Sequence, residues 1–328
     1  MPEGHSVHRI ARQFERHFEG VPVAVSSPQG RFATDAQKID GHRIVDSVAV
    51  GKQMFLEFDN GLWLRVHLGI YGAWDFAGDI TVDATTASAN GRMGQTNQRG
   101  TVVGSYEDSL SSIGAPRRTR LRMSEQERVE PDIESFPPEP IGAVRVRLLT
   151  DTAVADLRGP TACEVIGAEE KDATIAKLGP DPLVVDPQEG EDRFTAAVLK
   201  KPTSIALLLM DQTVVSGIGN VYRAELLFRA RLSPFIPGKE LHEATVRALW
   251  RDWTALLELG VQTGQMLTMD GLDDDAYQRA LASRDDRHWV YHRTGKPCRV
   301  CGTPIAMQEL GGRKLYWCPT DQSGEPVR

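Results

Sequence analysis

The chain has 328 residues, of which 41% are hydrophobic and 25% charged, a balance typical of a globular protein with room for two domains. It contains no apolar run of membrane-spanning length, so we expect a cytoplasmic protein with no membrane partner. Four cysteines in so long a chain exclude a disulfide-rich scaffold. The net charge of −7 argues against a nucleic-acid partner, although the basic residues are unevenly distributed.

Basic residues gather near the C-terminal end of the chain. Between Arg287 and Lys314, Glu309 is the single acidic residue among the basic side chains of Arg287, Arg293, Lys296, Arg299, Arg313 and Lys314. Acidic residues concentrate in segments that look like linkers. The charge of this C-terminal segment is therefore compatible with a phosphate-rich partner, even though the whole chain is acidic.

The chain begins Met1-Pro2-Glu3-Gly4, a start that offers unusual chemistry. The small Pro2 permits removal of the initiator methionine, which leaves a secondary amine with a pKa of about 8, against about 10.4 for lysine. Such an amine can attack an electrophilic sugar carbon and leave a cationic iminium that drives elimination. Glu3 can act as general acid and then as base. Alternatively, Pro2 only favours methionine removal and Glu3 only occupies a helix's first turn.

The residues after Gly4 predict a helix, because Val7, Ile10, Ala11, Phe14 and Phe18 recur at helical spacing. Pro2 would lie at the entrance of this helix. Residues 21–50 contain short alternating or β-branched runs separated by proline and glycine, which predict strands.

Residues 51–58 and 62–68 predict a β-hairpin, because Asn60-Gly61 separates two alternating apolar runs. This pairing places Lys52 and His67 near the open end of the hairpin, where a cation and an imidazole could meet a phosphate. The alternative for Lys52 is an ordinary solvated charge at the end of a strand.

The segment Gly69-Ile70-Tyr71-Gly72 follows the hairpin directly. Its glycines bracket a branched apolar side chain and an aromatic one, so the loop can present both outward. Apolar wedges of this kind enter base steps and hold a kinked duplex with an extruded nucleotide. The alternative is that Ile70 and Tyr71 fill a core.

Residues from about 78 to 140 lose hydrophobic periodicity and predict a disordered insertion in a surface loop. Strand character returns at residues 143–149 and 152–157. We therefore expect residues 1–178 to form an antiparallel β-sandwich with one leading helix. Cys163 in this domain is expected to be a small buried hydrophobic side chain rather than a ligand.

Residues 179–192 are rich in proline and acid, and predict an interdomain linker. Helices are then expected at residues 194–200, 204–210, 221–230 and 242–259. Between the second and third of these helices, Gly217-Ile218-Gly219-Asn220 allows backbone N–H groups at a helix start to approach a phosphate, with Asn220 adding a side-chain donor. The alternative is a plain turn capped by Asn220.

The C-terminal segment pairs Cys298-Arg299-Val300-Cys301 with Cys318 and Asp321. Two such knuckles bind zinc tetrahedrally and replace a hydrophobic core in a small hairpin. Asp321 stands where a fourth cysteine is expected, and zinc accepts a carboxylate, though more weakly. The alternative is a metal-free hairpin held by the aromatic residues Trp289, Tyr316 and Trp317.

In their order along the chain, these motifs resemble the formamidopyrimidine-DNA glycosylase and endonuclease VIII family, in particular its actinobacterial endonuclease VIII-like branch. The resemblance covers the chain outside the insertion and rests on Pro2-Glu3-Gly4, Gly51-Lys52, His67, Gly159-Pro160-Thr161, Leu178 to Leu183, Met210-Asp211-Gln212, Gly217 to Asn220 with Tyr222 and Glu225, and the cysteine hairpin. It implies an α+β multidomain fold, in which the β-sandwich precedes a helical helix-two-turn-helix domain, residues 193–286, and a zinc-finger β-hairpin, residues 287–322.

The resemblance also implies roles for individual residues. Pro2 would be the Schiff-base nucleophile, Glu3 the proton donor and Lys52 a lysine that assists the chemistry. The DNA-binding residues would include His67, Ile70, Tyr71, Asn220 and Arg313, with Ile70 and Tyr71 where the endonuclease VIII branch has intercalating side chains. Zinc would be held by Cys298, Cys301, Cys318 and Asp321.

We therefore expect a bifunctional DNA glycosylase and AP lyase of base excision repair that removes oxidised bases, pyrimidines preferentially, and cleaves the strand by β,δ-elimination. Its partner would be damaged duplex DNA, and we expect a monomer with no nucleotide cofactor. The alternatives are an oxidised-purine glycosylase of the same family and a non-catalytic damage-binding protein, against which intact Pro2, Glu3 and Lys52 argue.

Overall fold

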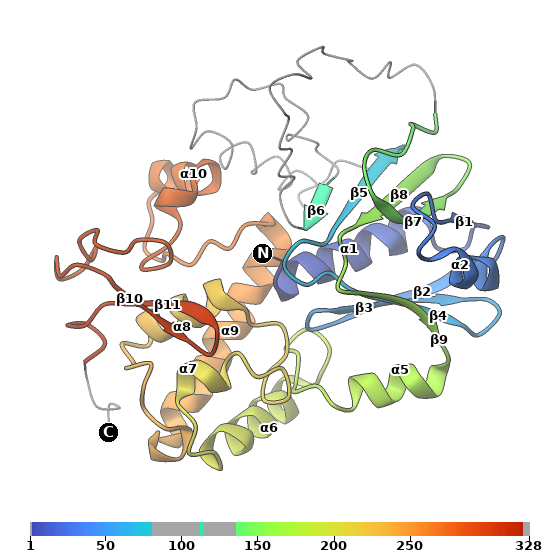
Figure 1. The fold of residues 1–328 in the computed structure, drawn as a ribbon. Helices are drawn as coiled ribbons and strands as arrows, with labels where there is room; N and C mark the ends of the chain where they lie inside the picture. Colours follow the sequence, from blue (N-terminus) through green and yellow to red (C-terminus); the bar gives the residue numbers. More distant parts are fainter. Residues whose placement is uncertain (1, 81–111, 115–135, 324–328) are drawn as a thin grey trace.

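The computed structural model describes residues 2–80, 112–114 and 136–323. Figure 1 shows the strands of the N-terminal part on one side of the molecule and the helices of the C-terminal part on the other. Most of the predicted insertion at about 78–140 lies outside the described residues. None of the helices in the described ranges has the length and apolar character that a membrane crossing needs.

The N-terminal part is a sandwich of two antiparallel sheets. One sheet has the order β1-β7-β8-β5-β6, with bounds Ala24–Ser26, Val144–Leu149, Ala153–Arg158, Ala73–Gly78 and Ser112–Gly114. The other has the order β2-β3-β4-β9, with bounds Ile44–Val50, Gln53–Phe58, Trp63–His67 and Ala162–Ile166. The predicted hairpin is thus β3 and β4, joined across residues 59–62.

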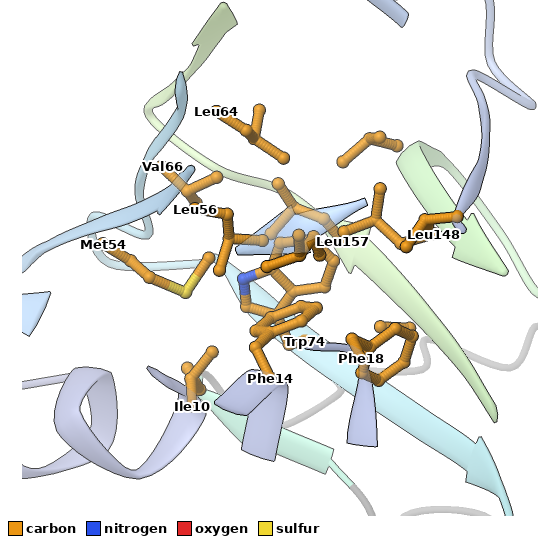
Figure 2. Close-up of a cluster of buried hydrophobic side chains, with 14 of the residues drawn as sticks. Ile10, Phe14, Phe18, Met54, Leu56, Leu64, Val66, Trp74, Leu148 and Leu157 are labelled. Atoms are coloured by element: carbon orange, nitrogen blue, oxygen red, sulfur yellow. The ribbon is translucent and has the colours of Figure 1, made fainter. Parts of the chain in front are cut away.

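The leading helix α1, Gly4–His17, buries its apolar face against the sandwich. Phe14 packs edge-on against Trp74, with ring centroids 4.9 Å apart, and also contacts the ring of Phe76. Figure 2 shows Phe14 and Trp74 together with side chains of both sheets in one core. Truncation of Phe14 to alanine would cost about 3–5 kcal/mol at such a site. This core fixes the entrance of α1, where Pro2 and Glu3 lie.

The sandwich differs from the prediction in three places. Helix α2, Ala33–Ile39, lies where strands were expected, and it buries Ala36 and Ile39 one helical turn apart. Helix α5, Ala168–Ile175, was not predicted and has no buried residue. Strand β6 falls inside the predicted insertion, where Ile113 is buried and pairs with Trp74 of β5, so these three residues belong to the sheet.

The C-terminal part consists of helices followed by a hairpin. The α-helices are α6 Pro187–Leu199, α7 Ile205–Leu208, α8 Asn220–Arg229, α9 Glu243–Thr263 and α10 Asp274–Ala282. Two 3-10 turns lie at Gly238–Glu240 and Arg284–Asp286. Strands β10, Ala306–Leu310, and β11, Arg313–Trp317, form the hairpin. The α+β class predicted from the sequence is therefore confirmed.

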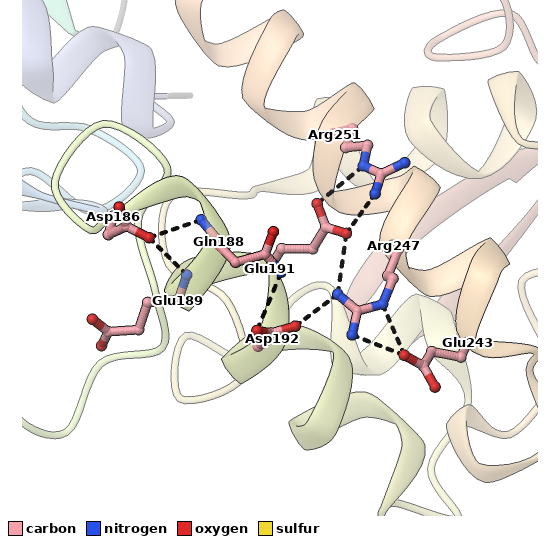
Figure 3. Close-up of polar contacts among 8 residues, drawn as sticks. All are labelled: Asp186, Gln188, Glu189, Glu191, Asp192, Glu243, Arg247 and Arg251. Carbon is pink, nitrogen blue, oxygen red and sulfur yellow. Dashed lines mark hydrogen bonds and ion pairs between the residues drawn. The ribbon is translucent and has the colours of Figure 1, made fainter.

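The predicted linker at residues 179–192 is too long, because α6 begins at Pro187. The Asp186 side chain caps this helix by accepting from the backbone N–H groups of residues 188 and 189. Glu191 then joins α6 to α9 through Arg247 and Arg251, as Figure 3 shows. The acidic residues that suggested a linker thus anchor one helix to another.

Candidate active site and nucleic-acid interface

Glu3 joins the N-terminus of the sandwich to helix α8. Its carboxylate is fully buried and accepts hydrogen bonds from the backbone N–H groups of Gly219 at 2.8 Å, Val221 at 2.9 Å and Tyr222 at 3.4 Å. These are the unpaired donors at a helix start, where the helix dipole also favours an anion. A Cβ atom at Gly219 would lie 2.4 Å from Glu3 Cδ, so only glycine allows this approach.

Pro2 is buried next to this cap. The following residue, Gly4, donates its N–H to the carbonyl of Gly217 at 2.9 Å. The start of the chain is therefore held against the turn between α7 and α8, the same turn that the sequence predicted as a phosphate-binding element. The prediction that Pro2 lies at the entrance of the leading helix is confirmed.

Lys52 reaches the same turn from the other direction. It precedes β3, is half-buried, and donates from Nζ to the carbonyl of Ile218 at 2.6 Å. Burial lowers the pKa of Lys52; the carboxylate of Glu3 opposes this shift and the cation of Arg313 adds to it. Lys52 is thus not the freely solvated charge of the alternative interpretation, since it lies within the field of both Glu3 and Arg313.

Asp181 ties three parts of this site together. Its Oδ2 atom accepts from the N–H of Gly51 at 2.6 Å and lies 2.8 Å from His8 Nε2 on α1. Oδ1 accepts from the N–H of Leu183. The Asp181 side chain is fully buried, and a Cβ at Gly51 would come within 2.6 Å of Ser216 Cβ. Asp181 therefore fixes the turn that carries Lys52, a role that sequence reasoning missed because it placed this residue in a linker.

His67 and the loop after it lie at the end of β4. His67 pairs with Gln53 across the hairpin, and burial lowers its pKa, with smaller contributions from Lys52 and Arg65. Ile70 is 37% exposed and Tyr71 is 78% exposed. This exposure excludes the alternative in which both side chains fill a core.

Asn220 opens helix α8 but does not cap it, because the cap is Glu3. Its side chain is buried, donates to the carbonyl of Lys314 at 2.8 Å and accepts from Arg223 Nη2. Asn220 thus links α8 to strand β11 in this structure. Its predicted phosphate contact would have to use the second N–H of the amide, since the first is engaged by the carbonyl of Lys314.

Arg313 lies at the tip of the hairpin and is exposed. Its charge reaches the candidate active site, since it contributes to lowering the pKa of Lys52. It also contributes to lowering the pKa of the buried Arg223 to about 10, a shift caused mainly by burial. The tip is a two-glycine turn in which Gly311 and Gly312 both have left-handed backbone, with φ of 61° and 69°. An exposed arginine on such a turn is free to meet a phosphate.

The four predicted metal ligands lie together at the base of the hairpin. The ligand atoms of Cys298, Cys301, Cys318 and Asp321 all lie within 4.8 Å of one another. Cys301 Sγ lies 3.4 Å from Cys318 Sγ, and Cys298 Sγ lies 3.0 Å from Asp321 Oδ2. All four cysteines of the chain are free thiols. Three thiols and a carboxylate at this spacing fit a tetrahedral zinc ion.

Three family models match successive parts of the chain. They are the formamidopyrimidine-DNA glycosylase N-terminal domain at residues 1–109, its H2TH domain at 178–270, and a zinc finger found in FPG and IleRS at 295–324. Proteins named endonuclease 8 1 from Mycobacterium tuberculosis and Mycobacterium bovis are 37% identical to this chain over 325 residues, covering 98% of it and 100% of their own length. The chain belongs to the formamidopyrimidine-DNA glycosylase and endonuclease VIII family.

Other relatives of the same family match less of the chain. The formamidopyrimidine-DNA glycosylase of Thermus thermophilus is 35% identical over 155 residues, 46% of this chain and 56% of its own length. Its crystal structure superposes with a TM-score of 0.64 at 22% identity, covering 99% of this chain and 100% of that one. The Lactococcus lactis enzyme, solved with DNA containing an AP site, gives 0.67 at 18% identity, covering 98% and 100%. These structures support the fold.

Membership of the family confirms the predicted class of activity, because its members are DNA glycosylases with AP lyase activity in base excision repair. The zinc prediction is also supported, since the matched zinc finger coincides with the four clustered ligands.

Proposed function

We propose that this chain removes oxidised bases, preferentially pyrimidines, from duplex DNA and cleaves the strand by β,δ-elimination. The observation that carries the proposal is the meeting of Pro2-Glu3 and Lys52 at the turn before α8, residues 216–219. An N-terminal amine, an acid and a lysine with lowered pKa are the groups that the reaction needs. Elements of both the sandwich and the helical part of the chain bring them together.

The chemistry follows from the amine. The nitrogen of Pro2 attacks C1′ of the damaged nucleotide, the bond from C1′ to the base breaks, and the base leaves with the proton that the Pro2 nitrogen gives up. Glu3 then protonates O4′ as the C1′–O4′ bond breaks, so that the opened sugar is left as an iminium. The resulting iminium acidifies the C2′ hydrogen, whose removal expels the 3′ phosphate, and a second elimination expels the 5′ phosphate. Water then releases the sugar remnant and restores the amine. Lys52 assists because its ammonium gives up a proton more readily than that of an ordinary lysine.

The proposed DNA contacts come from the sandwich, from helix α8 and from the hairpin. Ile70 and the strongly exposed Tyr71 would fill the space left by the extruded nucleotide. His67 and Asn220 would contact phosphates near the active site, and Arg313 would clamp the backbone from the hairpin tip. The charge of Arg313 contributes to lowering the pKa of Lys52, which supports a single continuous interface between sandwich and hairpin.

The proposed preference for pyrimidines rests on which relatives match the whole chain. Relatives named endonuclease 8 match 98% of it, whereas the formamidopyrimidine-DNA glycosylase of Thermus thermophilus matches 46%. The wedge Ile70-Tyr71 also lies where the endonuclease VIII branch has its intercalating side chains. We further propose a monomeric, cytoplasmic enzyme with a sandwich domain at residues 1–178, a helical domain that starts with α6 at Pro187 and ends at residue 286, and a hairpin at residues 287–322.

Borohydride trapping tests the proposal. Borohydride reduces the iminium to a stable amine, so a covalent adduct should form and its peptide should be N-terminal. We expect faster trapping on duplexes that carry an oxidised pyrimidine than on matched duplexes with an oxidised purine. A chain that retains Met1 serves as the control and should not be trapped.

Each contrary outcome points to a different alternative. An adduct on Lys52, or equal trapping of the chain that retains Met1, would contradict the role of Pro2. Faster trapping on oxidised purines would favour the purine glycosylase. Binding without any adduct would indicate a non-catalytic damage-binding protein.

A further inference from the structure

Arg231 has a backbone conformation that arginine rarely adopts. It directly follows α8 and its cap residue Ala230, and its φ is 53°, in the left-handed region that favours glycine. Among the described residues other than glycine, His292 is the other with positive φ. An arginine kept in such a position suggests that its side chain contributes something that glycine cannot.

The side chain of Arg231 binds one of the metal ligands. Its Nη1 atom donates to Asp321 Oδ1 at 2.5 Å, while the other carboxylate oxygen, Oδ2, faces Cys298 Sγ at 3.0 Å. The Asp321 side chain is 10% exposed, so this ion pair is partly shielded from water. The two oxygens thus have different partners, one in the thiol cluster and one outside it.

We infer that Arg231 is a positioning residue of the zinc site, which turns Oδ2 of Asp321 towards the metal and compensates the charge of the ligand set. Three thiolates and one carboxylate around a divalent ion leave a net negative charge. A guanidinium paired with the carboxylate lowers this excess. Groups that orient a metal ligand in this way commonly control metal affinity.

Further contacts keep Arg231 in place. Its guanidinium lies over the ring of Phe228, 5.6 Å from the centroid. Next to it, the carbonyl of Leu232 accepts from Gln322 Nε2, and Gln322 Oε1 accepts from the N–H of Cys318. The end of α8 and the second zinc knuckle are therefore joined by two separate connections, of which the Arg231 pair is the one that touches a ligand.

A double-mutant cycle on zinc retention tests the inference. The variants are Arg231→Gly, Asp321→Cys and the double variant, and the measurement is the rate of zinc loss to a chromogenic chelator, with zinc per chain measured by elemental analysis. Glycine suits the left-handed backbone, so Arg231→Gly removes the side chain without adding strain. We expect this variant to lose zinc about tenfold faster than the unmodified protein.

The background of Asp321→Cys distinguishes positioning from general support of the fold. A thiolate needs no guanidinium to orient it, so Arg231→Gly should change zinc loss little when residue 321 is cysteine. Arg299→Ala is the matched control, because it removes a positive charge beside Cys298. The Arg299 side chain donates to the carbonyl of Asp285 and not to Asp321. We expect its zinc loss to stay within about twofold of the unmodified protein.

Several outcomes would overturn the inference. Equal acceleration by Arg231→Gly in both backgrounds would mean that the arginine only supports the hairpin. Equal acceleration by Arg299→Ala would mean that any nearby charge suffices. If the unmodified protein contains no zinc, the four residues do not form a zinc site and the inference fails. If Arg231→Gly does not fold, Arg231→Lys, which keeps the charge but not the planar fork, should give intermediate zinc loss, and retention equal to that of arginine would contradict the inference.

Discussion

Two buried glutamates accept similar sets of hydrogen bonds at helix α8, one at its start and one within it. Glu3 accepts from three backbone N–H groups at the start of α8, and Glu225, within α8, accepts from those of Trp289, Val290 and Tyr291. Both are completely buried. Glu225 also accepts from the Thr268 hydroxyl, and burial raises its pKa although these hydrogen bonds oppose the shift.

The difference between the two sites lies in what surrounds the carboxylate. Glu3 follows Pro2 and lies within the field of Lys52, whereas the partners of Glu225 are backbone amides and a hydroxyl. A buried carboxylate that accepts hydrogen bonds from several backbone N–H groups therefore joins one segment of this protein to another at both sites. In the function proposed here, chemistry arises where an amine and a lysine are added to such a carboxylate.

The largest expected effect is a difference in base-excision rate between variants of the two glutamates. Glu3→Gln should reduce base excision by at least about a hundredfold, since it removes a group that transfers protons. Glu225→Gln should leave excision within about tenfold, because it touches no reacting atom. Both variants place an NH₂ group against backbone donors, and each should lose about 1–3 kcal/mol of unfolding free energy.

Single-turnover excision and chemical denaturation measure the two quantities separately. Glu225→Gln is the matched control, since it makes the same change in an equally buried carboxylate. Equal losses of activity in the two variants would show that Glu3 acts through stability alone.

The contrast between the two glutamates depends on Lys52 being held in place, and Asp181 provides that support. Asp181→Asn keeps the shape of the side chain but turns an NH₂ group towards Gly51 or Leu183, both of which donate to it. We expect a loss of about 1–3 kcal/mol in stability and about tenfold slower borohydride trapping, because the Lys52 turn shifts.

Asp211→Asn is the control for that experiment, as it makes the same replacement at a half-exposed residue that binds Lys201 and Thr213. Trapping at the normal rate in Asp181→Asn, with stability lowered, would show that Asp181 supports the fold without positioning Lys52.

A smaller effect is expected at the hairpin tip. Arg313→Ala should weaken binding to damaged duplex and lower the slope of log affinity against log salt by about one unit, as one phosphate contact is lost. Arg193→Ala removes the same charge on α6, where its partner is Glu189, and should leave the slope unchanged. Equal slopes for both variants would exclude the phosphate clamp.

Which features of this structure can be predicted from the sequence depends on how far apart along the chain the contacting residues lie. Pro2-Glu3, the β3–β4 hairpin and the cysteine knuckles are local patterns, and the structure contains all of them. The cap of α8 was not predictable locally, because Glu3 and Gly219 are separated by 216 positions. Local sequence therefore offers Asn220 as the cap of a helix that receives its cap from Glu3 in the sandwich.

The same reason explains the missed roles of Asp181 and Arg231. Composition assigned Asp181 to a linker, although its partners His8 and Gly51 lie in the sandwich. Arg231 meets Asp321 across 90 positions, and only its backbone conformation marks it as unusual. Short elements such as α2 were missed because a few residues of apolar spacing cannot outweigh neighbouring strand patterns.

The smallest effect concerns the protonation of His67. Burial lowers its pKa below the ordinary value of 6.5, and the positive charges of Lys52 and Arg65 lower it further. In the free protein His67 should therefore titrate below pH 6.5, as measured by NMR of the imidazole. Lys52→Met should raise this pKa, since it removes the larger of the two charge contributions.

DNA binding provides the decisive comparison. A phosphate beside the ring favours the imidazolium, so the pKa of His67 should rise in the complex with damaged duplex, and the complex should take up protons between the two pKa values. Affinity should then increase as the pH falls through this window. The variant His67→Gln should lose that pH dependence. An unchanged His67 pKa on binding would place the phosphates elsewhere and leave Arg313 as the nearest clamp.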